Sequence, residues 1–206
     1  MQRGIALFGG VFDPPHRGHL ALARLALTAL PIDRVRLVIA GRPPHKNVGE
    51  RTSGEHRLAM LRLAIGDDRD LEIDTRELSR SGPSYTVQTL REVRAEEPRR
   101  ELFFLIGGDN IRSIRQWYQA EEIFSLARVV AFPRPGSTLR FRPEDVPFLD
   151  ETALDRLNRD LVPGPETPGS SSEVRRRVAN GEPIRDLVPD AVANYIEHHG
   201  LYLSPC

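Results

Sequence analysis

Cysteine is almost absent from this chain of 206 residues, because the one thiol belongs to Cys206, the last residue. A single thiol can form neither an internal disulfide nor a multi-cysteine zinc site, and such usage is typical of a reducing cytosol. The chain also lacks the run of about 18 apolar residues that a spanning helix needs. The segment Met1–Gly10 becomes glycine-rich after too short an apolar run for a signal peptide. We therefore expect a soluble, cytoplasmic protein without a membrane partner.

Net charge of either sign is absent too, since 29 basic and 29 acidic side chains give a formal charge of zero. No field of the whole molecule would attract nucleic acid, so we expect no nucleic-acid partner and only local phosphate sites. With 39% apolar and 28% charged residues the composition is that of a globular protein. The length favours one domain, 1–206.

Short apolar runs alternate with segments of helical period along the first two thirds of the chain. The expected strands are Gly4–Phe8, Arg34–Ala40, Leu71–Ile73, Glu101–Ile106 and Arg128–Phe132. The expected helices between them are Leu20–Leu30, Glu55–Ile65, Thr86–Val93 and Ala120–Leu126. This order predicts an α/β fold with a Rossmann-like, doubly wound parallel sheet. Ligands of such sheets bind beyond the carboxyl ends of the strands, where strand order reverses, so we expect a site after the first strand.

The last third of the chain is less regular. Residues 137–168 are rich in proline and charge and are interpreted as an irregular connection or insertion with one helix near Thr152–Leu161. Ser170 and Glu173 have the spacing of a capping box, which begins a helix. A last helix is expected over Asp190–His199. Residues 170–206 thus form a small C-terminal helical part of the single domain.

The most informative segment is GGVFDPPHRGHL, Gly9–Leu20. Gly9 and Gly10 let backbone pass close to a ligand and permit a positive φ, and Asp13 begins a turn into the following helix. His16 and His19, three residues apart, can face one point at the helix start. Free N–H groups and the helix dipole favour an anion there, and imidazoles add donors for phosphate oxygens. The alternatives are an ordinary glycine turn or a zinc site, for which no third ligand is evident.

This segment resembles the (G)xFDPxHxGH signature of the adenylyltransferases and cytidylyltransferases that share the HxGH motif. The residues that match are Phe12, Asp13, Pro14, His16, Gly18 and His19. The resemblance implies that His16 and His19 are catalytic, contacting the triphosphate and stabilising an in-line transition state without a covalent enzyme intermediate. It also implies an ATP site that includes Gly9, Gly10, Phe12 and Gly18.

A second segment, GSSSEVR at Gly169–Arg175, is similar to the ISSTxIR signature of the same superfamily. Gly169 replaces an apolar residue there and Ser172 replaces threonine. Hydroxyl groups at a helix start with an arginine one turn on suit the β- and γ-phosphates, so Ser171, Ser172 and Arg175 are further ATP-binding candidates. The alternative is an ordinary capped helix.

Smaller motifs narrow the family. In order they are PPHK (Pro43–Lys46), SYTVQTL (Ser84–Leu90), IGGD (Ile106–Asp109), Trp117, Arg134 and YIEHHGLY (Tyr195–Tyr202). Together they resemble bacterial nicotinate mononucleotide adenylyltransferases over nearly the whole chain. The resemblance implies that Lys46 is catalytic and reaches the substrate phosphates, and that Asp109 and Arg134 contact ATP. It assigns the acceptor to Asp13, Lys46, Tyr85, Thr86, Trp117 and Tyr118.

Each of these assignments has a structural alternative. Lys46 and Arg134 could be surface charges, Trp117 a core residue and Asp109 the N-cap of a helix after Ile106. The sequence shows no carboxylate cluster that would form a protein cage for Mg²⁺, so the expected Mg²⁺ would arrive with ATP.

The reaction implied by the resemblance is transfer of AMP from ATP to nicotinate mononucleotide, which gives deamido-NAD and pyrophosphate. Nicotinamide mononucleotide or phosphopantetheine as acceptor, a cytidylyltransferase, and a silent nucleotide-binding module are the alternatives. SYTVQTL with a downstream Trp117 argues against the phosphopantetheine and cytidylyl enzymes, and a tRNA synthetase would need a further domain. The resemblance favours the acid over the amide of the mononucleotide. The oligomeric state is open, and a homodimer is compatible with the sequence.

Overall fold

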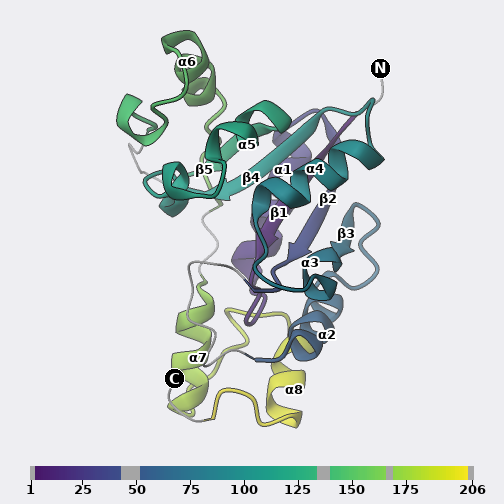
Figure 1. The fold of residues 1–206 in the computed structure, drawn as a ribbon. Coiled ribbons are helices and arrows are strands. Elements are labelled where there is room, and N and C mark those ends of the chain that lie inside the picture. The colour runs from purple at the N-terminus through teal and green to yellow at the C-terminus, as the bar shows by residue number, and fades with distance from the viewer. Residues whose placement is uncertain (1–2, 43–51, 134–139, 166–168, 204–206) are drawn as a thin grey trace.

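A five-stranded parallel sheet forms the centre of the molecule (Figure 1). The computed structural model describes residues 3–42, 52–133, 140–165 and 169–203. The strands are β1 (Gly4–Gly10), β2 (Ile32–Ile39), β3 (Leu71–Asp74), β4 (Leu102–Gly107) and β5 (Arg128–Phe132). Their order is β3-β2-β1-β4-β5, and every neighbouring pair is parallel. The α/β, Rossmann-like prediction is confirmed.

Helices cover both faces of this sheet. They are α1 (Arg17–Ala29), α2 (Gly54–Ile65), α3 (Arg76–Ser79), α4 (Thr86–Glu96), α5 (Ala120–Leu126), α6 (Glu151–Arg159), α7 (Ser171–Ala179) and α8 (Asp190–His198). Short 3₁₀ turns lie at η1 (Gly108–Asn110), η2 (Ile114–Gln116) and η3 (Pro143–Asp145). Apolar side chains of α1, α2, α7 and α8 share one core with the sheet, and those of α4, α5 and α6 share the other. The alternating directions of strand side chains supply both cores.

Most predicted elements are present, with shifted ends. β1 continues through Gly9 and Gly10, where the sequence predicted a turn, because both residues pair with β2. The predicted helices over Ala120–Leu126 and from Asp190 onward are found, and α6 is the helix expected inside the irregular 137–168 segment. The alternative of a helix directly after Ile106 is not met, since the 3₁₀ turns η1 and η2 lie between β4 and α5.

The strand order reverses between β1 and β4, because the chain moves to one side from β1 to β2 and β3 and to the other from β4 to β5. Two loops therefore leave the carboxyl edge of the sheet side by side at this point. One is the segment Val11–His16, called the signature loop from here on, and the other begins at Gly107. Figure 1 shows α7 and α8 beyond this edge and α6 near the opposite end of the molecule.

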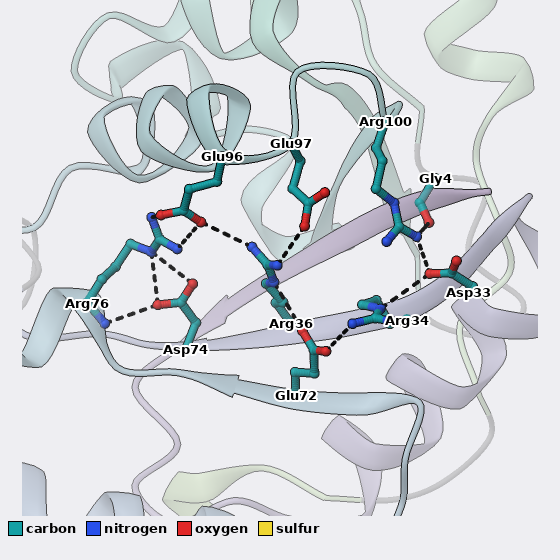
Figure 2. A network of polar contacts seen from close by, with 10 residues as sticks. All are labelled: Gly4, Asp33, Arg34, Arg36, Glu72, Asp74, Arg76, Glu96, Glu97 and Arg100. Carbon is teal, nitrogen blue, oxygen red and sulfur yellow. Dashed lines mark hydrogen bonds and ion pairs between the residues drawn. The ribbon is translucent and has the colours of Figure 1, made fainter. Parts of the chain in front are cut away.

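A network of ion pairs connects strands β2 and β3 to helix α4 (Figure 2). Arg36 on β2 contacts Glu72 at 3.1 Å and Glu97 at 2.9 Å, and Arg76 contacts Asp74 at 2.8 Å and Glu96 at 2.9 Å. The remaining members are Arg34, Arg100, Asp33 and the Gly4 carbonyl. This set, the edge network, joins β1, β2, β3 and α4. In the described part of the chain, no helix has the length and apolar character to cross a bilayer.

Candidate active site

The signature loop begins with a residue in the left-handed region. Phe12 has φ 51°, a value that a bulky residue adopts rarely, and its ring is buried edge-on against Phe8 and His19 at centroid distances of 5.9 and 5.0 Å. A Cβ on Gly10 would lie 2.8 Å from the Phe12 ring. Gly10 is thus required by close packing of the loop, and the positive φ that the glycines would permit occurs at Phe12 instead. The Asp13–Pro14 peptide bond is cis.

His16 and His19 meet at the start of α1, as predicted. Their rings are stacked, with centroids 3.6 Å apart, and His16 is the N-cap residue of the helix. The His16 backbone N–H donates to His19 Nδ1 at 3.2 Å. Because Nδ1 accepts this bond, neutral His19 carries its proton on Nε2. His19 can therefore donate a hydrogen bond from Nε2 at the N-terminus of a helix, where the dipole already favours an anion.

His16 is the more deeply buried member of the pair, with 8% of the residue exposed. Burial disfavours the imidazolium and lowers the pKa of His16 from 6.5 to about 4, so the ring is neutral at pH 7. Among the described residues, His16 Nδ1 has no hydrogen-bond partner. A buried nitrogen without a hydrogen-bond partner destabilises the fold by about 1–3 kcal/mol. Such atoms are rare in structural cores, so this one indicates a functional site.

The second signature lies directly against the first. The Ser171 hydroxyl donates to the Pro14 carbonyl at 2.9 Å, and Arg175 Nη1 donates to the Asp13 carbonyl at 2.7 Å. The predicted cap of α7 is confirmed, because the Ser170 hydroxyl accepts from the Glu173 N–H at 3.0 Å. The N-termini of α1 and α7 are thus both joined to the signature loop. Contacts of Ser171, Ser172 and Arg175 with phosphate stay predictions.

The backbone conformation of Gly169 and its closeness to His16 give a reason for glycine at a position where the family pattern has an apolar residue. Its φ is 148°, and a Cβ added there would lie 3.0 Å from His16 Nδ1 and 3.4 Å from His16 Cγ. A φ of this size is close to a glycine-only conformation. A larger residue would press on the buried His16 ring, so glycine here keeps α7 close to the histidine.

Two residues of the site had no role in the sequence-based prediction. Arg57 on α2, with 4% of its surface exposed, donates to the Val11 and Ala40 carbonyls at 2.8 Å each and to the Thr52 carbonyl at 3.2 Å. Tyr202 donates from its hydroxyl to Asp13 Oδ1 at 2.6 Å. The only signal for Arg57 was a charged residue within a run of helical period, and Tyr202 belonged to YIEHHGLY without a stated contact. Sequence spacing does not reveal such long-range bonds.

The predicted acceptor residues fall into two groups. Tyr85 and Tyr118 pack ring to ring at 4.5 Å, Tyr118 is 49% exposed, and Thr86 is the first residue of α4. Trp117 is partly buried and lies edge-on to Phe104 of β4 at 6.1 Å, so it contributes to the core on the α4 side of the sheet. The carboxylate of Asp13 is buried and accepts from Tyr202. Direct contacts of these residues with an acceptor stay predictions.

The remaining candidates are less defined. Asp109 lies on η1 and is exposed, and the N-cap of η1 is Gly107, so the alternative role of Asp109 as an N-cap is wrong. Lys46 and Arg134 lie outside the described residues. Within the described ranges, no group of three or more His, Cys, Asp or Glu residues could hold a metal ion.

Comparisons with known proteins agree over most of the chain. The cytidylyltransferase-like family matches residues 7–177. A Thermus thermophilus protein named "Probable nicotinate-nucleotide adenylyltransferase" is 44% identical over 200 residues, which cover 96% of this chain and 98% of that protein. A Shouchella clausii protein of the same name is 42% identical over 201 residues, covering 98% and 97%.

The solved structures support the fold. "Plasmodium falciparum nicotinic acid mononucleotide adenylyltransferase complexed with NaAD" superposes with a TM-score of 0.73 and covers 98% of both chains, at 22% identity. At this identity the likeness shows the common arrangement of the sheet and its helices.

Proposed function

The chain belongs to the cytidylyltransferase-like family and, within it, to the nicotinate-nucleotide adenylyltransferases, and on that premise we propose how its own residues perform the reaction. The enzyme transfers AMP from ATP to nicotinate mononucleotide in NAD biosynthesis and releases pyrophosphate. The product is deamido-NAD. The assignment of residues to this reaction is our proposal.

The observation that carries the proposal is that the N-termini of α1 and α7 are joined to one loop. His16 and His19 stack at the first, and at the second Ser171 donates to the Pro14 carbonyl and Arg175 to the Asp13 carbonyl. Helix N-termini combine free N–H groups with a favourable dipole, which suits a polyphosphate. We assign the triphosphate of ATP to the space beside this loop, with Gly9, Gly10, Phe12, Gly18 and Ser172 as the further contacts.

The chemistry needs alignment more than proton transfer. An oxygen of the acceptor phosphate forms a bond to the α-phosphorus of ATP, the bond from that phosphorus to the α,β-bridging oxygen breaks, and pyrophosphate leaves with the electron pair. The acceptor phosphate is already an anion at pH 7, so no general base is required. Catalysis then depends on orientation and on neutralising charge at the pentacoordinate phosphorus. We propose that His19 Nε2–H and neutral His16 supply this stabilisation, and the bond between the His16 N–H and His19 Nδ1 supports the proposal because it holds the two residues together.

Positive charge comes from side chains with different chemistry. Lys46 is the only lysine among the 29 basic residues, and an ammonium on a flexible stem suits contact with moving phosphates. We assign it, by family resemblance, to the phosphates of both substrates, and Arg134 to adenine or phosphate. Mg²⁺ is proposed to enter as part of the substrate, held by ATP oxygens.

The acceptor is assigned to the side of the sheet covered by α4. Tyr85 and Tyr118 form an aromatic pair in which Tyr118 is exposed and Tyr85 partly buried, and Trp117 lies next to β4. We propose that Trp117 stacks on the pyridine ring, with Tyr85, Thr86 and Tyr118 near its carboxylate and Asp109 at a ribose or adenine of ATP. Asp13 remains a candidate for binding the acceptor, because its carboxylate oxygens have lone pairs beyond those that accept from Tyr202 and Thr52.

A pyrophosphate-release assay tests the proposed function. ATP and CTP are each offered with nicotinate mononucleotide, its amide and phosphopantetheine, in the presence of Mg²⁺. We expect release with ATP and nicotinate mononucleotide to exceed that with every other pair by at least about tenfold, because donors that match a carboxylate leave a group unpaired opposite the NH₂ of the amide. Equal release with the amide would remove the acid-specific assignment. Absence of release with all six pairs would favour a silent nucleotide-binding module.

A further inference from the structure

The last described residues of the chain return to the signature loop. After α8 the chain turns at Gly200, with φ 57°, and Tyr202 lies beside the loop. Its hydroxyl donates to Asp13 Oδ1 at 2.6 Å across a separation of 189 residues. This bond joins the C-terminal helical part to the turn that precedes His16.

The buried carboxylate of Asp13 needs the hydrogen bond from Tyr202. The residue is only 4% exposed, and its other carboxylate oxygen faces the Thr52 N–H at 3.4 Å, a long distance for a hydrogen bond. A buried carboxylate is costly unless it is hydrogen-bonded, and an O–H···O⁻ bond is among the strong ones. The Tyr202 hydroxyl is therefore the principal donor to this carboxylate.

Tyr202 is suited to being a permanent donor. Burial and the neighbouring Asp13 carboxylate raise the pKa of Tyr202 well above its usual value of 10, so the hydroxyl keeps its proton throughout the working range. Its φ of 64° lies in the left-handed region, which is unfavourable for a non-glycine residue. The surrounding contacts, the bond to Asp13 among them, offset that cost.

We propose that Tyr202 is a positioning residue for adenylyl transfer, which acts through Asp13 to fix the turn that presents His16 and His19. The proposal rests on the proposed function of the signature loop. Arg175 donates to the Asp13 carbonyl and Ser171 to the Pro14 carbonyl, so hydrogen bonds from α7 hold the main chain of the turn in place. Tyr202 holds the Asp13 side chain by its hydrogen bond, and Asp13 lies three residues before His16.

The first test compares two tyrosine-to-phenylalanine variants. Tyr202→Phe removes the hydroxyl that contacts Asp13, and Tyr195→Phe on α8 removes one that contacts His56 Nδ1 at 2.9 Å, neither of which belongs to the loop. A small displacement of catalytic groups can cost a large factor in rate. We expect kcat of Tyr202→Phe to fall about tenfold with both KM values within about twofold of wild type. Tyr195→Phe should keep kcat within about twofold, which is the ordinary variation of a remote change.

A double-mutant cycle with Asp13→Ala, which removes the carboxylate that accepts from Tyr202, shows whether Tyr202 acts through Asp13. If it does, adding Tyr202→Phe to Asp13→Ala changes kcat by less than about twofold, whereas independent residues would multiply their effects. The proposal is overturned if kcat of Tyr202→Phe stays within twofold of wild type, or if it falls equally in both backgrounds. A fall in kcat that Tyr195→Phe reproduces would overturn it as well.

Hydrogen–deuterium exchange separates this proposal from the proposed function, because it needs no turnover. The peptide covering residues 11–20 should exchange faster in Tyr202→Phe than in wild type and Tyr195→Phe, since local opening becomes easier. Unchanged exchange of that peptide would overturn the positioning role even in an active enzyme. A wild-type protein without pyrophosphate release would instead refute the proposed function and leave the exchange result to decide the role of Tyr202 in the loop.

Discussion

The signature loop and the edge network use arginine in opposite ways. In the edge network, Arg36 and Arg76 each contact carboxylates from two or more elements (Figure 2). Beside the signature loop, Arg175 donates to the Asp13 carbonyl and Arg17 to the Arg185 carbonyl, and among the described residues neither has a carboxylate within ion-pair distance. One region balances its charge internally, and the other leaves positive charge beside the helix N-termini.

This difference assigns the edge network to the stability of the fold and the residues around the signature loop to function. Half-buried ion pairs that join several elements hold the fold, and their charges are largely cancelled for anything outside. Backbone carbonyls hold an arginine in place but do not cancel its charge, so Arg175 can add to the potential that attracts a triphosphate. We therefore expect changes in the edge network to alter stability alone and changes at the loop to alter turnover.

The largest effect is expected for His19→Ala. Loss of one transition-state donor should lower kcat by about 10²–10³, equivalent to about 3–4 kcal/mol, with little change in fold. Steady-state kinetics and thermal unfolding measure the two quantities. His198→Ala, an exposed histidine on α8, is the matched control and should leave kcat unchanged. Turnover of His19→Ala near that of wild type would contradict the assigned role.

His16 should make stability depend on pH below neutrality. Its pKa is about 4 in the folded protein and about 6.5 when unfolded, so between these values the unfolded chain binds more protons. The free energy of unfolding should therefore fall by about 3 kcal/mol as pH falls from 6.5 to 4. His16→Asn removes this titration and retains a good N-cap residue. Denaturant unfolding of both proteins measures the difference, and parallel pH curves would show that His16 is not buried as described.

Arg36→Met tests the other region. The change leaves Glu72, Glu96 and Glu97 without this partner, and Arg36 is only 15% exposed, so the free energy of unfolding should fall by about 1–2 kcal/mol. We expect kcat to stay at the wild-type value because, among the described residues, the Arg36 side chain bonds only to Glu72, Glu96 and Glu97, none of which lies in the signature loop. Urea unfolding at low and at 1 M salt should show a smaller difference at high salt. A fall in kcat comparable with the loss at His19 would break the separation of the two regions.

The smallest effect is expected for a matched pair of glycine variants on either side of α7. Gly169→Ala and Gly181→Ala each place a Cβ at a positive φ, 148° and 70°, and should each cost about 1 kcal/mol of stability. Only the Cβ at position 169 meets His16, whereas the Cβ at position 181 meets nothing within 4 Å. Kinetics should show a several-fold loss of kcat for Gly169→Ala alone. Equal kcat in both variants would mean that the His16 ring can move aside without consequence.

Local patterns predicted the elements and the meeting of His16 with His19. Helical and strand periods depend on neighbouring residues, and the capping role of Ser170 follows from a spacing of three. The extension of β1 through Gly9 and Gly10 was missed because pairing with β2 overrides the turn preference of glycine. The positive φ of Phe12 could not be predicted, since it is maintained by packing against Phe8 and His19.

Contacts between distant segments were the main omission. Arg57 and Tyr202 reach the signature loop from positions 46 and 189 residues away, and no spacing rule connects them with Val11 or Asp13. The close approach of Gly169 to His16 is of the same kind, because it appears only when α7 is placed against the loop. The sequence showed Gly169 as a weakness of the second motif, and the structure gives it a packing reason.

The connection of the signature loop to late parts of the chain also determines when the site can form during synthesis. The loop leaves the ribosome early, while Ser171, Arg175 and Tyr202 follow 157, 162 and 189 residues behind their partners. At about 5–20 residues per second, the loop waits on the order of ten seconds or more for them. The nascent sheet can assemble before the last helices emerge, but the signature loop gains its contact with Tyr202 only after α8 has been synthesised.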